Sequence, residues 1–290
     1  MDTLSRRQFL AGTAAGVAAW GLMPAAGYAQ AGKGIRLSAC DWSLGAKGPG
    51  GLEVAKAIRL DGLEVSAGEA TDTLLIADPA YREQYKNLMK TTGVAVSSVA
   101  MGFLNGSPLA TEPRGVAWLE QTIGATKDLG ASVILIAFFG KGDLRKGNEL
   151  KKAEVDALVG KLKEAAPKAK ESGVILGLEN TLSAKQNLDI LERVGHDAVR
   201  VYYDVGNSTD NGYDVPAEIR LLGDRICQFH FKDGGHYLGE GKVAMKPVAD
   251  AMNTIGYKGW VVLETAAPSK DRDADFRRNA NFVRGLLGAA

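Results

Sequence analysis

Four residues able to ligate a divalent cation occur in the second half of the chain, each at the end of a short apolar run. They are Glu179, Asp204, His230 and Glu264. Successive members are 25, 26 and 34 residues apart, which is the length expected for one strand–helix unit. Side chains at equivalent positions of successive units can converge in space, so we expect these four to form one cluster.

Three carboxylates and one imidazole make a mixed oxygen and nitrogen ligand set. Hard oxygen ligands favour Mn²⁺ or Mg²⁺, and the imidazole also admits Co²⁺ or Zn²⁺. A carboxylate buried without a partner is unfavourable, and a bound cation offsets that penalty. Taken singly, each acid could cap a helix and the histidine could be a satisfied core residue. Their recurrence in consecutive units favours a single divalent metal site.

The elements that must position these residues alternate between strand and helix. Eight short β-rich runs lie at residues 35–40, 62–66, 94–100, 132–138, 174–179, 201–204, 226–231 and 260–265. Segments of helical periodicity lie at residues 52–58, 79–91, 113–129, 149–171, 188–194, 215–222, 243–255 and 274–287. Strands that alternate with helices predict a parallel sheet with right-handed crossovers.

Eight such units predict a (β/α)₈ TIM barrel in a single α/β domain, for which about 250 residues are typical. A doubly wound sheet is the alternative, but no GxGxxG or Walker phosphate loop opens a helix. No linker rich in Ser, Pro and Gly divides the chain. In a TIM barrel the carboxyl ends of the strands face the active site, which places the four candidate ligands at the barrel mouth.

An ordered set of short motifs is similar to a known family. LEN at 178–180, YYDVGN at 202–207, HFKD at 230–233 with LGEG at 238–241, and LET at 263–265 resemble the sugar isomerase/epimerase family with the xylose isomerase-like barrel. That family includes ketose 3-epimerases and hydroxypyruvate isomerase. The resemblance implies that Glu179, Asp204, His230 and Glu264 hold one divalent metal. It also implies that Glu179 and Glu264 act as the catalytic acid/base pair.

The chemistry of such a site can be stated from first principles. A metal chelated by a ketone oxygen and a neighbouring hydroxyl acidifies the C–H bond between them and stabilises an enediolate. One carboxylate can remove the proton, and a carboxylate on the opposite face, or the same one, can return it. The sequence therefore predicts a metal-dependent sugar isomerase/epimerase that acts next to a carbonyl.

Several positions differ from the epimerase pattern. Asn207 and His236 stand where the epimerases usually have a substrate-binding His and an Arg, and Lys185 stands where an acid is common. Lys232 has the same strand parity as His230, so it either points at the substrate or is a solvated lysine. We take Asn207, Lys232 and His236 as the candidate substrate-binding residues.

A further acid, Glu64, lies on the second predicted strand. A carboxylate at this position is read first as a buried ion pair or a cap rather than as a metal ligand.

Three other functions are weighed against an isomerase. A metal-dependent lyase acting on keto-sugars or 3-keto-glycosides would form the same enediolate and then expel a β-substituent. A non-catalytic periplasmic sugar-binding module would not need an acid/base pair. The related apurinic endonucleases share this barrel but use several metals and many His ligands, whereas this chain has 3 His.

The amino-acid composition of the chain excludes several other classes of protein. With 46% hydrophobic and 24% charged residues, the chain is too apolar for a disordered tail and too charged for a membrane bundle. Two Cys cannot build a disulfide scaffold. Because 35 basic residues face 34 acidic ones, no basic field indicates a nucleic acid partner. We expect a small-molecule sugar, keto-sugar or glycoside as partner, and the sequence leaves a homo-oligomer open.

Residues 1–29 are predicted to be a twin-arginine signal peptide. SRRQFL at 5–10 precedes an Ala/Gly-rich apolar run, which is followed by AAGYA at 25–29. This order is typical of a cleaved export signal and leaves the barrel domain at 30–290, in the periplasm. The apolar run 10–23 is too short to cross a bilayer core of about 30 Å, so we expect no stable membrane anchor.

Overall fold

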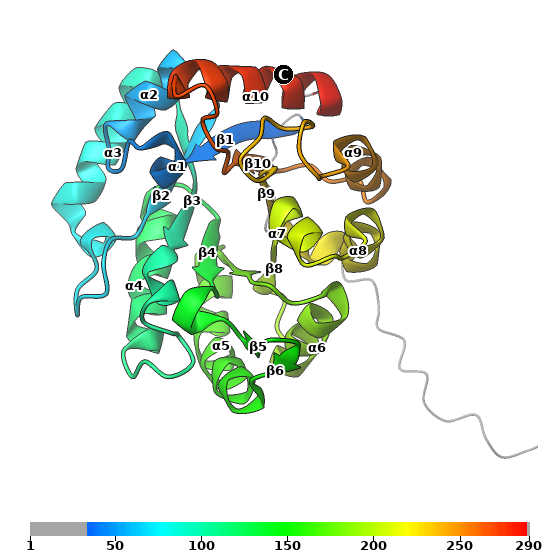
Figure 1. Ribbon diagram of the computed structural model, residues 1–290. Coiled ribbons are helices and arrows are strands. Elements are labelled where there is room, and N and C mark those ends of the chain that lie inside the picture. Colours follow the sequence, from blue (N-terminus) through cyan, green and yellow to red (C-terminus); the bar gives the residue numbers. More distant parts are fainter. Residues whose placement is uncertain (1–33, 289–290) are drawn as a thin grey trace, which may run out of the picture.

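The computed structural model describes residues 34–288, and residues 1–29, predicted to be a signal peptide, lie outside them. The principal strands are β1 (Arg36–Cys40), β2 (Gly62–Ser66), β3 (Ala95–Met101), β4 (Val133–Ala137), β7 (Ile175–Glu179), β8 (Val199–Asp204), β9 (Ile226–Phe231) and β10 (Trp260–Leu263). They close into a parallel barrel in the order β1-β10-β9-β8-β7-β4-β3-β2. In Figure 1 the helices surround these strands. The predicted single-domain TIM barrel is confirmed.

The outer layer consists of helices that follow the strands. They are α2 (Gly51–Ala57), α3 (Pro79–Thr92), α4 (Gly115–Asp128), α5 (Lys152–Ser172), α6 (Ala184–Val194), α8 (Val215–Leu222), α9 (Met245–Thr254) and α10 (Arg272–Leu287). Two shorter helices, α1 (Asp41–Leu44) and α7 (Val205–Asp210), begin directly after β1 and β8. Within residues 34–288, none of the helices has the length and apolar character needed to span a membrane.

The ends of the helices follow from local chemistry. Helix α3 begins where the Asp78 carboxylate accepts a hydrogen bond from the backbone N–H of Ala80, and it ends at Gly93 with a positive φ of 73°. That left-handed conformation suits glycine and closes the last turn. The Asp78 cap and the left-handed Gly93 therefore set the two ends of this helix.

Two helices begin three or four residues away from the start that the periodicity predicted. The segment predicted to be helical from residue 149 starts as strand β6 (Glu149–Leu150), which pairs with β5 (Arg145–Lys146) in a small antiparallel hairpin. Helix α5 therefore begins at Lys152. Helix α6 begins four residues before the predicted start at residue 188, because Ser183 and Gln186 form a reciprocal capping box.

The register of the sheet brings the ends of four neighbouring strands together. Asp204 in β8 lies opposite His230 in β9, and Leu263 in β10 lies opposite Phe231. Glu264 follows Leu263 directly. Glu179 ends β7, the neighbour of β8 on the other side. Four functional side chains from strands far apart in sequence are thus carried to one edge of the barrel.

The interior of the barrel holds one apolar and one polar set of residues. A cluster of inward-facing apolar residues fills part of the barrel, and it includes Val133, Leu135, Trp260 and Val262. A second set is polar and fully buried, and it contains Ser38, Glu64, Ser98, Gln228 and His230. Buried polar groups are stable only when hydrogen-bonded, so this second set must form a connected network.

Candidate active site

The structure brings the four sequence-predicted ligands together at the barrel mouth. Each of Glu179, Asp204, His230 and Glu264 offers one ligand atom, and these atoms all lie within 4.8 Å of one another. The first three side chains are buried, and Glu264 is partly exposed. Carboxylate oxygens and one imidazole nitrogen that converge in this way form a plausible geometry for a divalent cation.

His230 stands at the centre of the cluster. Its Nδ1 lies 2.8 Å from Glu179 Oε1 and 3.6 Å from Glu264 Oε2. Asp204 Oδ1 accepts a hydrogen bond from the backbone N–H of Asn207 at 2.8 Å. Asp204 Oδ2 is buried and accepts no hydrogen bond from residues 34–288. One oxygen of Asp204 is therefore anchored, while the other faces the cluster.

Lys232 belongs to the cluster and is not a solvated lysine. Its Nζ donates to Glu264 Oε2 at 2.8 Å and lies 3.0 Å from Asp204 Oδ2. A Cβ on Gly206 would come within 2.4 Å of Lys232 Cγ. Glycine at this position therefore allows Lys232 to reach the two carboxylates.

The protonation of these groups is strongly perturbed. Burial raises the pKa of Asp204 to about 7, although Lys232 opposes the rise. Burial alone would raise the pKa of Glu264, but His230 and Lys232 together lower it to about 2. For Lys232, burial is outweighed by Asp204 and Glu264, which raise its pKa. Three carboxylates thus share the mouth with one lysine and one histidine, and a bound cation would compensate these crowded acids.

Glu64 lies beneath the cluster, on the far side of the His230 ring. Glu64 Oε1 is 2.7 Å from His230 Nε2. Its other oxygen accepts hydrogen bonds from Ser98 Oγ at 2.6 Å and from Tyr202 OH at 2.8 Å. Glu64 is thus the buried ion-pair partner that the sequence led us to expect. Both ring nitrogens of His230 lie within hydrogen-bond distance of a carboxylate oxygen. With a cation at the mouth, Nε2–H would donate to Glu64 and the Nδ1 lone pair would be left for the cation.

A second trio of ligand-type residues shares the same histidine. Cys40, Glu64 and His230 also lie close enough to hold an ion. However, both Glu64 oxygens already have hydrogen-bond partners, and burial raises the pKa of the Cys40 thiol well above its usual value. A protonated thiol is a poor ligand. The trio is better explained as support for His230 than as a cation site.

None of the three predicted substrate-binding residues, Asn207, Lys232 and His236, is among the described residues that line the cavity beside the cluster. Asn207 is in the first turn of α7, where its backbone N–H binds Asp204. His236 is exposed on the loop after β9. Their role toward a substrate stays a prediction, whereas Lys232 contacts two of the candidate ligands.

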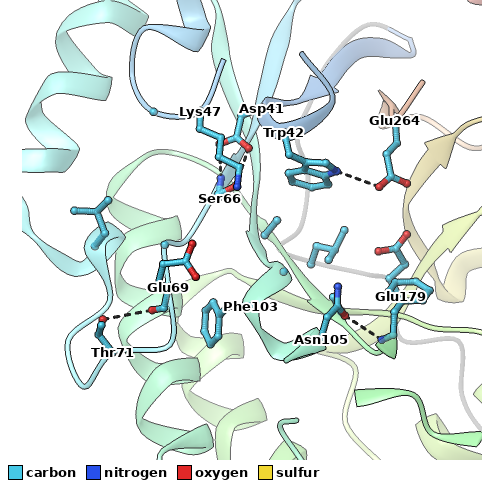
Figure 2. A pocket seen from close by; sticks show the side chains of 18 of the residues that line it. Asp41, Trp42, Lys47, Ser66, Glu69, Thr71, Phe103, Asn105, Glu179 and Glu264 are labelled. Atoms are coloured by element: carbon cyan, nitrogen blue, oxygen red, sulfur yellow. Dashed lines mark hydrogen bonds between the residues drawn. The ribbon is translucent and has the colours of Figure 1, made fainter. Parts of the chain in front are cut away.

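A cavity of about 720 Å³ opens beside the cluster. Figure 2 shows Glu179 and Glu264 on one side of it, with Glu69 and Thr71 on the opposite side. Glu179 and Glu264 line this cavity, whereas Asp204 and His230 do not. The two carboxylates therefore belong both to the four-residue cluster and to the lining of the cavity.

Trp42 is a site residue that the sequence did not reveal. Its indole Nε1–H donates to Glu264 Oε1 at 3.1 Å, and the side chain lines the cavity. Trp42 follows the end of β1, and one aromatic residue after a strand is not a specific signal of function. It fixes one oxygen of Glu264, while Lys232 contacts the other.

Comparison with known proteins points to one group. A model of the xylose isomerase-like TIM barrel family matches residues 52–286. The chain is 24% identical over 203 residues to a 2-epi-5-epi-valiolone 7-phosphate 2-epimerase of Actinoplanes sp., covering 69% of this chain and 73% of that protein. It is 28% identical over 181 residues to an L-ribulose 3-epimerase of Mesorhizobium japonicum, covering 57% of this chain and 59% of that protein.

A solved structure is similar over nearly its whole length. The 3-keto-D-glucoside 4-epimerase of E. coli superposes with a TM-score of 0.72 at 14% identity, covering 87% of this chain and 99% of that one. At this identity the likeness shows the fold alone. The curated relatives are epimerases, and epimerases are isomerases, so the predicted enzyme class is confirmed.

The Glu64 network predicts a large effect on stability. Glu64→Ala removes the acceptor of Ser98, Tyr202 and His230 in a dry interior, and breaking a buried pair in this way costs about 3–5 kcal/mol. We expect a loss of that size in the free energy of unfolding, measured by urea denaturation. The exposed acid Glu53 is the matched control, and Glu53→Ala should change stability by no more than about 0.5 kcal/mol. A loss below about 1 kcal/mol for Glu64→Ala would contradict the network.

Proposed function

The chain belongs to the xylose isomerase-like TIM barrel family, and from this premise we propose that it is a metal-dependent sugar epimerase or isomerase. One observation carries the proposal. Glu179 and Glu264 are members of the four-residue cluster and also line the cavity. Two carboxylates placed in this way can reach a substrate carbon while the cluster holds a cation.

The described residues fit a divalent cation. Glu179, Asp204, His230 and Glu264 would hold it, because their ligand atoms converge within 4.8 Å. Asp204 Oδ2 makes an ion pair with Lys232 at 3.0 Å but no hydrogen bond within residues 34–288. Mn²⁺ or Mg²⁺ suits the three carboxylates, and Co²⁺ or Zn²⁺ suits the histidine. When bound, the cation supplies a Lewis acid that polarises a carbonyl of the substrate.

The acid/base work falls to the two carboxylates that line the cavity. Strands β8 and β9 lie between β7 and β10 in the barrel, so Glu179 and Glu264 approach the cavity from two separated strands. One of them removes the proton next to the carbonyl, which gives an enediolate. The other returns a proton to the opposite face, which inverts that carbon. Trp42 and Lys232 hold the two oxygens of Glu264 during this exchange.

Export of the folded protein is part of the same proposal. The SRRQFL motif at 5–10 supports recognition by the twin-arginine system. The cation cluster is assembled from four different strands, so it exists only in the folded barrel. Transport in the folded state would let the cytoplasm supply the metal before the protein reaches the periplasm.

The proposed centre predicts one tightly bound divalent metal per chain. Elemental analysis after dialysis against Mn²⁺ should find about one equivalent. Asp204→Asn removes a direct ligand, and because loss of an outer partner already costs about 10–100-fold in affinity, we expect at least about 100-fold weaker binding. Asp210→Asn, an exposed acid on α7, is the matched control. No bound metal in the wild type, or equal affinity in Asp204→Asn, would refute the centre.

The acid/base assignment predicts exchange with solvent. In D₂O the wild type should place deuterium on the carbon next to the substrate carbonyl. Glu179→Gln and Glu264→Gln keep the shape but lose the base, so each should slow turnover about 10²–10⁴-fold. Metal occupancy is measured in parallel, and Glu53→Gln serves as the control. Full activity of either variant with metal bound would exclude that residue as the base, and release of an alcohol fragment would indicate a lyase.

The signal motif predicts a block in export after a conservative change. Arg6→Lys combined with Arg7→Lys should leave the precursor in the cytoplasm, as measured by fractionation and immunoblotting. The chain holds a second arginine pair on the exposed side of α10, so Arg277→Lys with Arg278→Lys provides a matched control that should still be exported. Periplasmic delivery of the Arg6/Arg7 variant would disprove recognition by the twin-arginine system.

A further inference from the structure

The cavity beside the acid/base pair is larger than a single sugar needs. A hexose has about twelve non-hydrogen atoms, and even at the roughly 30 Å³ that one water occupies in the liquid it fills no more than about 360 Å³. The cavity measures about 720 Å³. A ring bound at Glu179 and Glu264 therefore leaves about half of the space open.

The open half lies over the N-terminal strands, away from the cation cluster. In Figure 2 the cavity extends from Glu179 and Glu264 past Phe103 to Glu69 and Thr71. The distal part is lined by the segment after β2 and by the turn after β3, with the lining residues Gly68, Glu69, Thr71, Thr73 and Phe103. We call this part the distal subsite.

The wall of the distal subsite is fixed by packing against α4. Trp118 is fully buried, its ring meets Phe103 edge-on at 5.0 Å, and its Nε1–H donates to the carbonyl of Thr71 at 2.7 Å. The Gln121 side chain accepts from the backbone N–H of Leu74 at 2.8 Å and donates to the carbonyl of Asp72 at 2.9 Å. A preformed wall of this kind is typical of a ligand site.

The charges of the lining disfavour an anionic ligand. Lys47 is the single basic side chain among the described lining residues, which also include the acids Asp41, Glu69, Glu179 and Glu264. The Asp41 carboxylate accepts two hydrogen bonds from Ser66. A phosphate group is normally held by arginines, lysines or several backbone N–H groups. The distal subsite offers instead an aromatic ring, two hydroxyls and one carboxylate, which suit an uncharged sugar ring.

We propose that the substrate is an uncharged keto-glycoside, with the keto-sugar ring at Glu179 and Glu264 and the second ring in the distal subsite. This inference rests on the proposed function and narrows it to a substrate class. Phe103 presents its ring to the apolar face of the second sugar. Glu69, Thr71 and Thr73 offer hydrogen-bonding groups around it.

A panel of three ligands tests the substrate class. The Mn²⁺-loaded protein is given a free 3-keto-hexose, the 6-phosphate of the same sugar, and a disaccharide oxidised to the ketone at C3 of one ring. Calorimetry measures the affinity for each ligand, and deuterium incorporation from D₂O measures turnover. We expect the keto-disaccharide to bind at least about tenfold more tightly than either monosaccharide, since each hydrogen bond made by the second ring adds to the affinity.

A variant of Phe103 tests whether the second sugar ring binds in the distal subsite. Phe103→Ala should lower the ratio of kcat/KM for the keto-disaccharide to that for the free keto-hexose by about tenfold, because the truncated side chain faces only the second ring. Phe282, an exposed phenylalanine of α10, is the matched control, and Phe282→Ala should leave the ratio unchanged. Thermal melting of both variants checks the fold.

The outcomes separate the inference from the function on which it rests. Equal or tighter binding of the free keto-hexose or its phosphate would overturn the keto-glycoside class, even if deuterium exchange proves the epimerase chemistry. Absence of exchange with every ligand would overturn the proposed function, while the calorimetric preference would still decide what the distal subsite binds. An unchanged ratio in Phe103→Ala would place the second ring elsewhere and refute the subsite.

Discussion

The architecture of the site depends on His230, which is buried between two carboxylates. Glu64 lies 2.7 Å from one ring nitrogen, and Glu179 lies 2.8 Å from the other. This arrangement fixes the plane of the ring and determines which nitrogen faces the barrel mouth. Without Glu64 below it, the imidazole could rotate, and the cluster of four ligand atoms would lose its centre. The polar interior of the barrel, including Ser98 and Tyr202, holds Glu64 in place.

The barrel divides two tasks between its halves. The ends of strands β7, β8, β9 and β10 carry the candidate cation cluster and the proposed acid/base pair, and the segments after β1, β2 and β3 form most of the cavity. Trp42 joins the halves, because it follows β1 and donates to Glu264. The residues that carry out the reaction can therefore stay the same while the residues that line the cavity vary with the substrate. In this way one barrel fold supports many reactions. Curated relatives that act on phosphorylated and on free substrates, as their names state, agree with this division.

Sequence patterns predicted the eight strands and the convergence of the four ligand candidates, because strand length and spacing are local properties. They did not predict the hairpin of β5 and β6, whose two-residue strands are too short to show a period. Trp42 and the distal subsite also escaped detection, since they arise where segments distant in sequence meet. Lys232 illustrates the limit of prediction from sequence. Its strand parity was correct, but its ion pairs depend on the missing Cβ at Gly206, which no periodicity reveals.

The central claim is that His230 directs Nδ1 toward one cation at the barrel mouth. Its most direct test is a crystal structure of the protein grown with Mn²⁺, with anomalous scattering used to locate the metal. The account predicts one anomalous peak among Glu179, Asp204, Glu264 and Nδ1 of His230, with Glu64 still bound to Nε2. A peak on the other side of the ring, between Cys40 and Glu64, or no peak at either place, would contradict it.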